Sequence, residues 1–478
     1  LMRDNARDLG KSPASNNRLT RTVRPGFDFS TVVPVNKRFG FTLTASSTDQ
    51  YHNSNGLVAT WRGAFGVTNG TTLPDTTPDR PYLTDFTVRD GPRTESRSSV
   101  GATVDYKLGP NDRLSFAIHR VDLGAEFHNH TLAFLVNSVA PGNFSLTHTR
   151  GAAGAGEVRL TNGERHRSGS SLSPSLTWRH HGPVWRAEAG LGYSEADTAF
   201  RDLGKGFFSS SIARRSGVTV SFDKIDYMRP GAITVTDAAG APVDFTKIGT
   251  YALSTANSIE SDSIDEQRTA FANAARHLPW RVPVTVKAGV DVRHSLRDLR
   301  GLTSPYNFVG ADGRASLTPV GNDDSAAVVL DGIFSQRPAG FGFPAIQWVD
   351  NAALAALART NPAYITLDRN NAYRSEVNLS KHIEETISSA YLRADASFFE
   401  RRLKLTGGVR AEQTNVSAEG PLTDASRNFQ RDANGRAILG ANGQPLTLST
   451  DPLTIAQRTI IDRGLRSKKE YLRFFPSL

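Results

Sequence analysis

Hydrophobic and polar residues alternate along several stretches of the chain. In residues 284–297 the even positions are mostly Val, Ala and Leu, whereas the odd positions include Lys287, Asp291 and Arg293. Successive side chains of a β-strand point to opposite faces, so this stretch predicts a strand with one apolar and one charged face. Similar alternation, weakest in the first, seventh and last of these segments, predicts ten further strands at residues 27–35, 39–48, 98–108, 113–123, 171–179, 185–196, 269–276, 390–398, 403–415 and 471–478.

The connections between these strands alternate between short and long. The short ones contain Gly, Pro, Asn and charged residues, as tight turns do, and lie at residues 36–38, 109–112, 180–183, 278–283 and 400–402. The long ones cover about residues 50–95, 126–168, 198–266, 298–384 and 417–466. Loops beyond about 15 residues are uncommon in compact domains. The strict alternation places every long loop at one end of the sheet, as in an outer-membrane barrel with periplasmic turns and extracellular loops.

The strand lengths and aromatic positions agree with a lipid environment. Most of the predicted strands have about the 9–11 residues that a tilted strand needs to cross a bilayer. Tyr106, Trp178, Trp185 and Phe398 lie near the turn ends, where an interfacial aromatic girdle is expected. The alternative is a soluble β-sandwich, whose strands are usually shorter, about 5–6 residues. We therefore predict an all-β, antiparallel transmembrane β-barrel.

Composition excludes several classes of protein and of functional site. Basic residues outnumber acidic ones by 56 to 47, and this excess is spread along the chain, so we expect no nucleic-acid partner. No apolar run approaches the ~18 residues of a membrane-spanning helix. Cysteine is absent, which excludes disulfide scaffolds, thiolate metal sites and cysteine nucleophiles. No secretory signal opens the sequence, and residues 471–478 resemble a strand about to turn, so we expect an interior piece of a longer protein.

Catalytic chemistry is not indicated. The sequence contains no GxSxG, HExxH or GxxxxGK[ST] motif and no GxGxxG that leads a βαβ unit. His128 and His130 could share one face of a strand, but no third metal ligand accompanies them. Asp291, Asp395 and Glu412 could form an acid–base pair, but alternating charges on a water-filled wall explain them equally. We expect no enzymatic activity, no metal and no cofactor.

The long loops carry the candidate binding residues. Rigid scaffolds with variable loops commonly bear recognition sites, and aromatic rings can stack on sugars or flat chelates. The alternative for each ring is packing within the loop. The predicted ligand-binding residues are Trp61, Tyr227, Tyr306, Phe341 and Trp348.

Two short helices are also predicted in the loops. Asp350 can cap a helix over residues 351–359. Asp451 and Pro452 can open a second helix over residues 453–463, which Gly464 can close. Asp432 and Asn434 fit a turn better than a calcium site, because the spacing of oxygen ligands is not sustained.

Two adjacent segments resemble a known family. Residues 383–395 (IEETISSAYLRAD) and 402–414 (RLKLTGGVRAEQT) are similar to a strand pair in the β-barrel of TonB-dependent outer-membrane receptors. In the second segment Gly407, Gly408, Arg410 and Glu412 match a family motif that we expect to be structural. Residues 35–41 (VNKRFGF) and 471–478 (YLRFFPSL) also resemble parts of such barrels.

This resemblance implies a barrel of about 22 strands around an N-terminal plug. Such receptors take up scarce nutrients, including siderophores, cobalamin and oligosaccharides, with energy delivered by the TonB complex through an N-terminal region. The sequence contains neither plug nor TonB-binding region, so we expect residues 1–478 to be part of a monomeric barrel, embedded in lipid of the outer membrane of a Gram-negative-type bacterium. The alternatives are a passive porin, a ligand-binding or adhesion barrel and, more remotely, an outer-membrane enzyme.

Overall fold

The eleven predicted strands are all present, and most are longer than predicted. The computed structural model describes residues 11–14, 18–21, 25–68, 72–226, 229–316, 323–400 and 402–477, with side chains from residue 25 onward. We call the eleven strands the wall strands. They are β3 (Phe27–Pro34), β4 (Phe39–Asn53), β7 (Pro92–Lys107), β8 (Asp112–Leu135), β11 (Gly156–His181), β12 (Trp185–Arg201), β15 (Ala252–Leu278), β16 (Val284–Phe308), β18 (Lys381–Phe398), β19 (Leu403–Thr423) and β20 (Ile460–Ser477).

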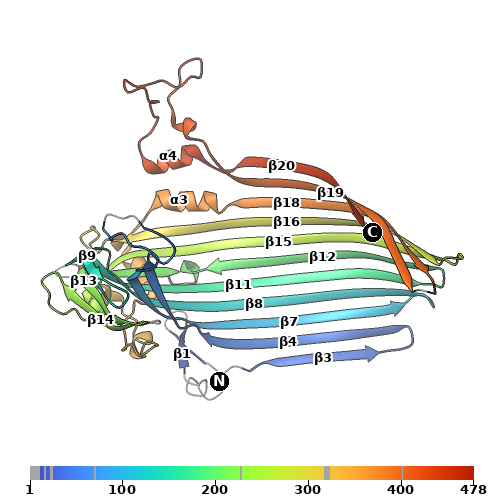
Figure 1. Cartoon of the computed structure of the whole chain (residues 1–478), viewed down its shortest axis with the longest axis horizontal. Coiled ribbons are helices and arrows are strands. Elements are labelled where there is room, and N and C mark those ends of the chain that lie inside the picture. Colours follow the sequence, from blue (N-terminus) through green and yellow to red (C-terminus); the bar gives the residue numbers. More distant parts are fainter. Residues whose placement is uncertain are drawn as a thin grey trace.

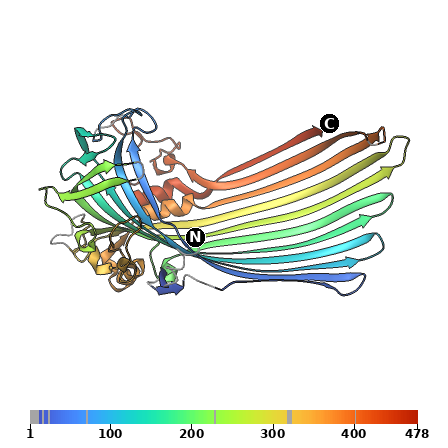
Figure 2. The ribbon, with the colours of Figure 1, turned by 60° about the horizontal axis from the view of Figure 1, so that its bottom comes forward.

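The wall strands form one antiparallel sheet in which each pairs with the next in that order. They lie side by side in Figure 1, and Figure 2 shows the sheet curving between its edges β3 and β20. Beyond Arg201 the place of β12 between β11 and β15 is taken by β13 (Ser210–Ile225), which pairs with both of these strands. This arrangement confirms the antiparallel barrel class predicted from the sequence.

The short connections gather at one end of the sheet, on the right in Figure 1. Between β3 and β4 the Asn36 side chain closes the turn, because its Oδ1 accepts hydrogen bonds from the backbone N–H groups of Arg38 and Phe39 at 2.8 and 2.9 Å. Such side-chain bonds to the following backbone are the reason that Asn favours turns. At the opposite end the long connections are folded.

The remaining elements belong mostly to these long connections. We call the described parts of residues 54–91, 136–155, 202–251 and 309–380 the outer cap. The strands of the outer cap are β5 (Gly56–Arg62), β6 (Tyr82–Asp90), β9 (Val139–Phe144), β10 (Thr149–Gly151), β13, β14 (Pro230–Asp237) and β17 (Ile365–Leu367). Two further strands, β1 (Lys11–Ala14) and β2 (Arg18–Arg21), form a separate pair. The helices are η2 (Leu203–Lys205), η3 (Ile248–Thr250), η4 (Ala326–Val329), η5 (Phe334–Gln336), α2 (Asn351–Thr360), η6 (Pro362–Tyr364), α3 (Arg369–Asn378), η7 (Ala425–Asn428) and α4 (Pro452–Thr459). Within the described residues, no helix combines the length and apolarity needed to span a bilayer.

The helix predictions are largely confirmed. Asp350 caps α2, accepting hydrogen bonds from the N–H groups of Ala352 and Ala353 at 2.8 and 3.0 Å. Asp451 caps α4 through the N–H of Thr454 at 2.8 Å. The predicted end of this second helix is wrong. It ends at Thr459 because the next residues enter β20 and pair with β19, which overrides their helical pattern. Helix α3 was not predicted.

One face of the wall is apolar and exposed near the turns. Val290, Leu392 and Leu405 are 54%, 55% and 51% exposed, which is unusual for a large apolar side chain in a folded core. The register places Leu392 opposite Val409 in the next strand, so the exposed side chains form a continuous surface. On β12 this surface runs from Trp185 to Tyr193, about the length that a tilted strand needs to cross a bilayer. We call it the lipid-facing band.

Further from the turns the same face is covered by the outer cap. The β8–β11 register is unshifted from Asp112–His180 to Leu135–Glu157, so even-numbered residues stay on one face throughout. On this face Phe116 is exposed near the turns, whereas Leu132 and Phe134 are fully buried in the core of the cap. A single apolar face therefore meets lipid at one level and protein at another.

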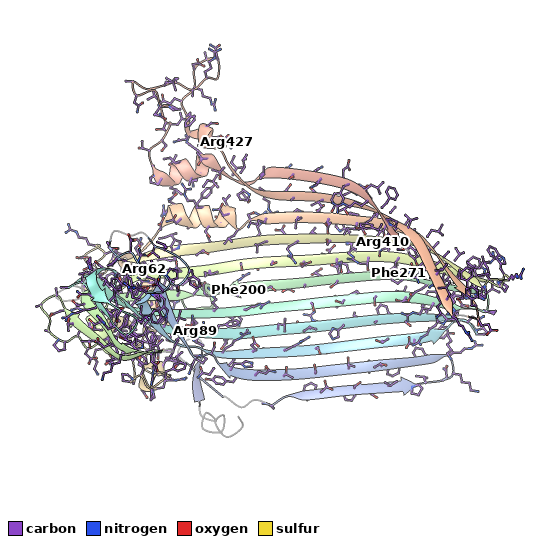
Figure 3. All side chains as sticks on the ribbon, viewed as in Figure 1. Arg62, Arg89, Phe200, Phe271, Arg410 and Arg427 are labelled. Carbon is purple, nitrogen blue, oxygen red and sulfur yellow. The ribbon has the colours of Figure 1, made fainter. Side chains whose placement is uncertain are left out.

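The opposite, polar face carries ion pairs between neighbouring strands. Lys287 Nζ lies 3.1 Å from an oxygen of Asp395, and Arg179 Nε lies 2.7 Å from an oxygen of Glu188. Within β19, Glu412 is paired with Arg410 at 2.9 Å. Figure 3 shows Arg410 and Phe271 toward the turns and Phe200 toward the cap. These pairs agree with charges on a wetted wall, and we call this side the lumenal face.

The family-like motif around residues 407–412 occupies structural positions. A Cβ on Gly408 would lie 2.8 Å from the carbonyl oxygen of Leu392 and 3.1 Å from Cα of Arg393, so the neighbouring strand approaches too closely for a side chain. Arg410 and Glu412 bond each other. These contacts agree with a structural role for the motif.

Gly289 provides a test of side-chain packing on the lumenal face. It lies between Asn273 and Tyr391, whose OH donates a hydrogen bond to Asn273 Oδ1 at 3.1 Å. A Cβ at this position would overlap Asn273 Oδ1 and lie 2.6 Å from Tyr391 Cε1. We expect Gly289→Ala to displace the ring and lower the free energy of unfolding in urea by about 1–3 kcal/mol. Gly420→Ala, which has open space around it, is the matched control and should change stability little.

Candidate functional site

Three arginines lie together on the lumenal face, at the level where the cap begins. Arg97 is on β7, and Arg165 and Arg167 are two residues apart on β11; all three are exposed. The register of the strands between them places Arg97 opposite Leu123 and Arg167 opposite Ala125. We call Arg97, Arg165 and Arg167 the arginine cluster. Among the described residues, no ion pair joins any of the three to a carboxylate.

The acidic residue two positions from Arg97 on the same face of β7 is already engaged. Glu95 forms an ion pair with Arg93, whose guanidinium also lies 4.5 Å from the centre of the Phe127 ring. On the other side of the cluster, Arg167 lies 6.0 Å from the centre of the Phe200 ring. Such cation–π contacts orient a guanidinium without neutralising it. The cluster therefore keeps its positive charge and has flat apolar surfaces beside it.

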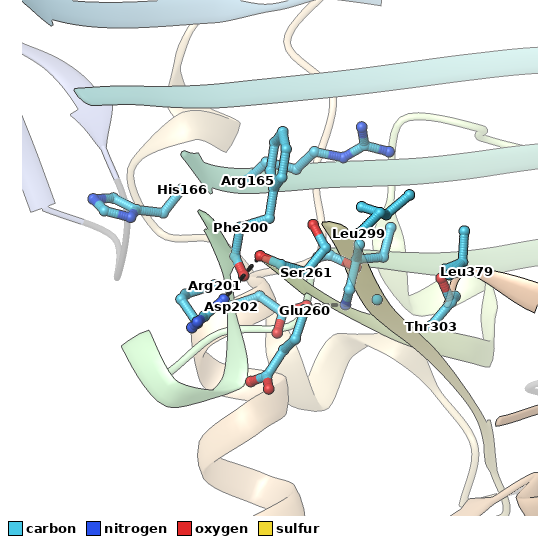
Figure 4. Close-up of a pocket in the computed structure, with 13 residues that line it drawn as sticks. Arg165, His166, Phe200, Arg201, Asp202, Glu260, Ser261, Leu299, Thr303 and Leu379 are labelled. Carbon is cyan, nitrogen blue, oxygen red and sulfur yellow. Dashed lines mark hydrogen bonds between the residues drawn. The ribbon is translucent and has the colours of Figure 1, made fainter. Parts of the chain in front are cut away.

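Two cavities adjoin the cluster. The first has a volume of about 290 Å³, and Arg97 and Arg167 both line it. Thr48, Gln50, Leu123, Ala125 and the carboxylate of Glu95, which is paired with Arg93, are also in its wall. The second has a volume of about 280 Å³ and is shown in Figure 4. Arg165 and Phe200 line it, its apolar wall includes Ile259 and Leu299, and two acidic residues, Asp202 and Glu260, also line it. Because Arg165 and Arg167 share one face of β11, the cavities are neighbours.

A buried carboxylate fixes the wall of the second cavity. Asp202 is buried and accepts hydrogen bonds from Ser258 Oγ at 2.7 Å and from the N–H of Ile259 at 2.5 Å. Arg201 Nη1 donates to the carbonyl oxygens of Phe200 and Ser261 at 2.8 and 3.0 Å. These bonds tie the end of β12 to β15 and hold Phe200 in position, so this wall is preorganised.

The five predicted ligand-binding aromatics are not gathered into one site. Trp348 is 2% exposed, and Trp61 and Tyr306 are partly buried against the core of the cap. Phe341 is 41% exposed, and Tyr227 lies outside the described residues. The structure thus shows packing contacts for Trp61, Tyr306 and Trp348, and the binding role of all five stays a prediction.

Sequence reasoning missed the arginine cluster. Arg165 and Arg167 fall in the segment 126–168, which was predicted as a loop, although β11 in fact begins at Gly156. Arg165, Arg167 and Gly169 lie on one face of β11, and His166 and Ser168 lie on the other. No apolar–polar alternation marks this part of the strand, because polar residues occupy both faces.

His128 and His130 serve in the core of the cap. The ring of His130 stacks on Phe334 with centroids 3.7 Å apart and meets Trp348 edge-on at 5.2 Å. Within the described part of the chain, no cluster of three potential metal ligands is found. Both rings lie on the part of β8 beyond the lipid-facing band. Burial lowers the pKa of His128 to about 4 and that of His130 well below its ordinary value.

Acid is therefore expected to loosen the cap. Because both imidazoles have lower pKa values in the folded state, their contribution to stability is complete above about pH 6.5 and is lost as the pH falls toward 4. Hydrogen exchange in residues 323–361 should become faster over this interval. The double variant His128→Phe/His130→Phe should show a flatter pH profile. The buried Asp331, whose pKa is raised by burial, acts in the opposite direction but is present in both proteins.

Comparisons with known proteins give only distant structural matches. No family model and no curated protein matches the sequence. A structure of the ferric citrate transporter FecA in the unliganded form matches with 9% identity and a TM-score of 0.13 over 84% of this chain, which spans 57% of that protein. The outer membrane transporter YddB from Escherichia coli matches with 6% identity and a TM-score of 0.09, over 95% of this chain and 75% of its own. A double mutant of the Serratia marcescens hemophore receptor HasR, in complex with its hemophore HasA and heme, matches with 10% identity and a TM-score of 0.09. The match covers 94% of this chain and 80% of the receptor chain.

Proposed function

We propose that the chain is the barrel part of an outer-membrane receptor that captures a scarce nutrient for energised uptake. One observation carries this proposal: a sheet with a lipid-facing band and a charged lumenal face bears a large folded cap at one end only. The cap packs a core against the wall: Tyr82, Phe222 and Tyr251 of the cap and Phe134 of β8 are all fully buried in it. A diffusion channel does not need a large folded cap, whereas a receptor needs a structured surface that recognises its ligand.

The remaining parts of the proposal follow from the family resemblance of residues 383–414. The partners would be a small-molecule or oligosaccharide ligand, outer-membrane lipid and the TonB complex, reached through a plug region of the whole protein. The receptor would act as a monomer in the outer membrane. Capture would use noncovalent contacts alone, followed by displacement of the plug.

Uptake in cells tests this proposal. Cells with and without the gene would be supplied with radiolabelled iron chelates, cobalamin and oligosaccharides, with a protonophore or a deletion of TonB as the second variable. We expect accumulation of one label to require the gene, the proton gradient and TonB together. Gene-dependent accumulation that survives the protonophore would instead support a passive porin. Gene-dependent binding of a label without accumulation would support an adhesion or binding barrel.

A further inference from the structure

The arginines of the lumenal face differ from one another in charge compensation. Near the turns, Arg113, Arg179 and Lys287 each lie within 3.1 Å of a carboxylate oxygen. Further out, the three members of the arginine cluster have no ion pair within the described residues. Uncompensated like charges repel one another, and a bound anion would relieve that repulsion.

The spacing of the cluster suits one bound molecule. Arg97 and Arg167 are separated by β8 and offset by two residues along the strands, which places their backbones about 12 Å apart for a strand spacing of ~4.8 Å and a rise of ~3.3 Å per residue. Both residues line the same 290 Å³ cavity, from the two strands that flank β8. Arg165 lines the adjacent 280 Å³ cavity. A molecule of drug-like size, with two or more charged groups, fits the two cavities together.

The surroundings of the cluster add an apolar surface. Leu123 is 44% exposed on this otherwise polar face and lies in the floor of the first cavity with Ala125. Phe200, Ile259 and Leu299 line the second cavity. Thr48 and Gln50 supply neutral hydrogen-bonding groups at the rim. The site therefore combines guanidinium groups that bind oxyanions with flat and aliphatic surfaces that exclude water.

We propose that the arginine cluster binds a ligand with two or more carboxylate or other oxyanion groups on a flat, apolar body. This inference rests on the proposed receptor function and names the chemical class of its ligand. The guanidinium groups hold the oxyanions by charge-assisted, bidentate hydrogen bonds, and Phe200 and Leu123 contact the body. Neutral sugars, which the loop aromatics alone would suit, do not use this site.

Binding of a synthetic trianion tests the inference. The probe is benzene-1,3,5-tricarboxylate, and its neutral counterpart is benzene-1,3,5-tricarboxamide. Both are titrated by calorimetry into the full chain in lipid nanodiscs. We expect the tricarboxylate to bind, with an affinity that falls as salt is added, and the tricarboxamide not to bind. The triple variant Arg97→Gln/Arg165→Gln/Arg167→Gln should bind it at least tenfold more weakly.

A matched control separates the cluster from general charge. Arg113→Gln/Arg179→Gln/Arg297→Gln removes the same number of charges from the lumenal face, but each of these arginines is ion-paired. It should keep the affinity of the parent. The variant Arg97→Lys/Arg165→Lys/Arg167→Lys keeps the charge but loses bidentate geometry, and its affinity should fall between those of the two Gln triple variants. A difference in gel migration between unheated and heated protein verifies that each variant is folded.

The outcomes are distinguishable from those of the uptake experiment. Absence of tricarboxylate binding, or an equal loss in both Gln triple variants, overturns the inference, even if energised uptake of a nutrient persists. Binding that depends on the arginine cluster supports the inference, even if uptake proves independent of the proton gradient. In that second case only the proposed function fails.

Discussion

Val290→Arg is expected to lower the free energy of unfolding by about 2–4 kcal/mol in lipid vesicles. Val290 is exposed near the middle of the lipid-facing band, with Ala272 and Ala390 as its neighbours on the adjoining strands. A guanidinium at this level would lie in hydrocarbon, where it has neither water nor a counter-charge. Urea-dependent unfolding of the full chain in phospholipid vesicles measures the effect.

The adjacent position supplies the control. Asp291 is next in sequence but points to the lumenal face, where charged side chains are wetted. We expect Asp291→Arg to cost at least about 1 kcal/mol less than Val290→Arg, because an arginine there remains in water. Equal costs at the two positions would mean that the two faces of β16 meet the same environment, contrary to the barrel.

Trp348→Ala is expected to destabilise the cap by about 3–5 kcal/mol. Trp348 is almost completely buried, and its indole packs edge-on against His130 and Phe334. Its removal leaves a cavity in the cap core, while the pairing of the wall strands near the turns is untouched. Proteolysis and hydrogen exchange should therefore increase in residues 323–361 and stay unchanged in β16 and β18.

Phe341→Ala serves as the comparison in the same loop. Its ring is largely free of the core, so we expect a change within about 0.5 kcal/mol. If both substitutions opened the cap equally, the packing role of Trp348 would be wrong. If ligand uptake were lost on Phe341→Ala with the cap intact, the predicted binding role of Phe341 would be supported.

The sequence predicts the wall near the turns well because alternation there has a single physical cause. Lipid on one side and water on the other require apolar and polar residues in turn, as in Val284, Val286 and Val290 against Lys287 and Asp291. The turns are also determined by local sequence, since the Asn36 side chain accepts hydrogen bonds from the backbone N–H groups of Arg38 and Phe39. The registers of β15 with β16 and of β18 with β19 then follow from the short connections.

The outer half of the wall cannot be predicted in this way. There the face that continues from the lipid-facing band is covered by protein, which accepts polar groups when they have partners. Asn162 is buried and donates a hydrogen bond to the carbonyl oxygen of Val349, and its own carbonyl oxygen accepts one from Asn351 Nδ2 at 3.2 Å. These partners are more than 180 residues away in sequence. Contacts of that range leave no local pattern, which is why β8 and β11 are predicted too short.

The candidate site was missed for the same reason. Arg165 and Arg167 become neighbours of Arg97 only because β8 and β11 continue beyond the lipid-facing band. The predicted loop aromatics, by contrast, include residues that the cap uses for its own core. In a cap of this size, an aromatic residue such as Trp348 is needed to bury apolar area, and its type alone does not distinguish packing from binding.

The orientation of the two faces of the wall is tested most directly by spin labels. The sequence has no cysteine, so a single cysteine introduced at Val290, Leu392, Asp291 or Arg393 can be labelled uniquely. In lipid vesicles we expect labels at positions 290 and 392 to collide mainly with oxygen, which dissolves in the bilayer. Labels at positions 291 and 393 should collide mainly with a water-soluble nickel chelate. Protection of positions 290 and 392 from both reagents, or access of the nickel chelate to all four positions, would contradict a lipid-embedded barrel.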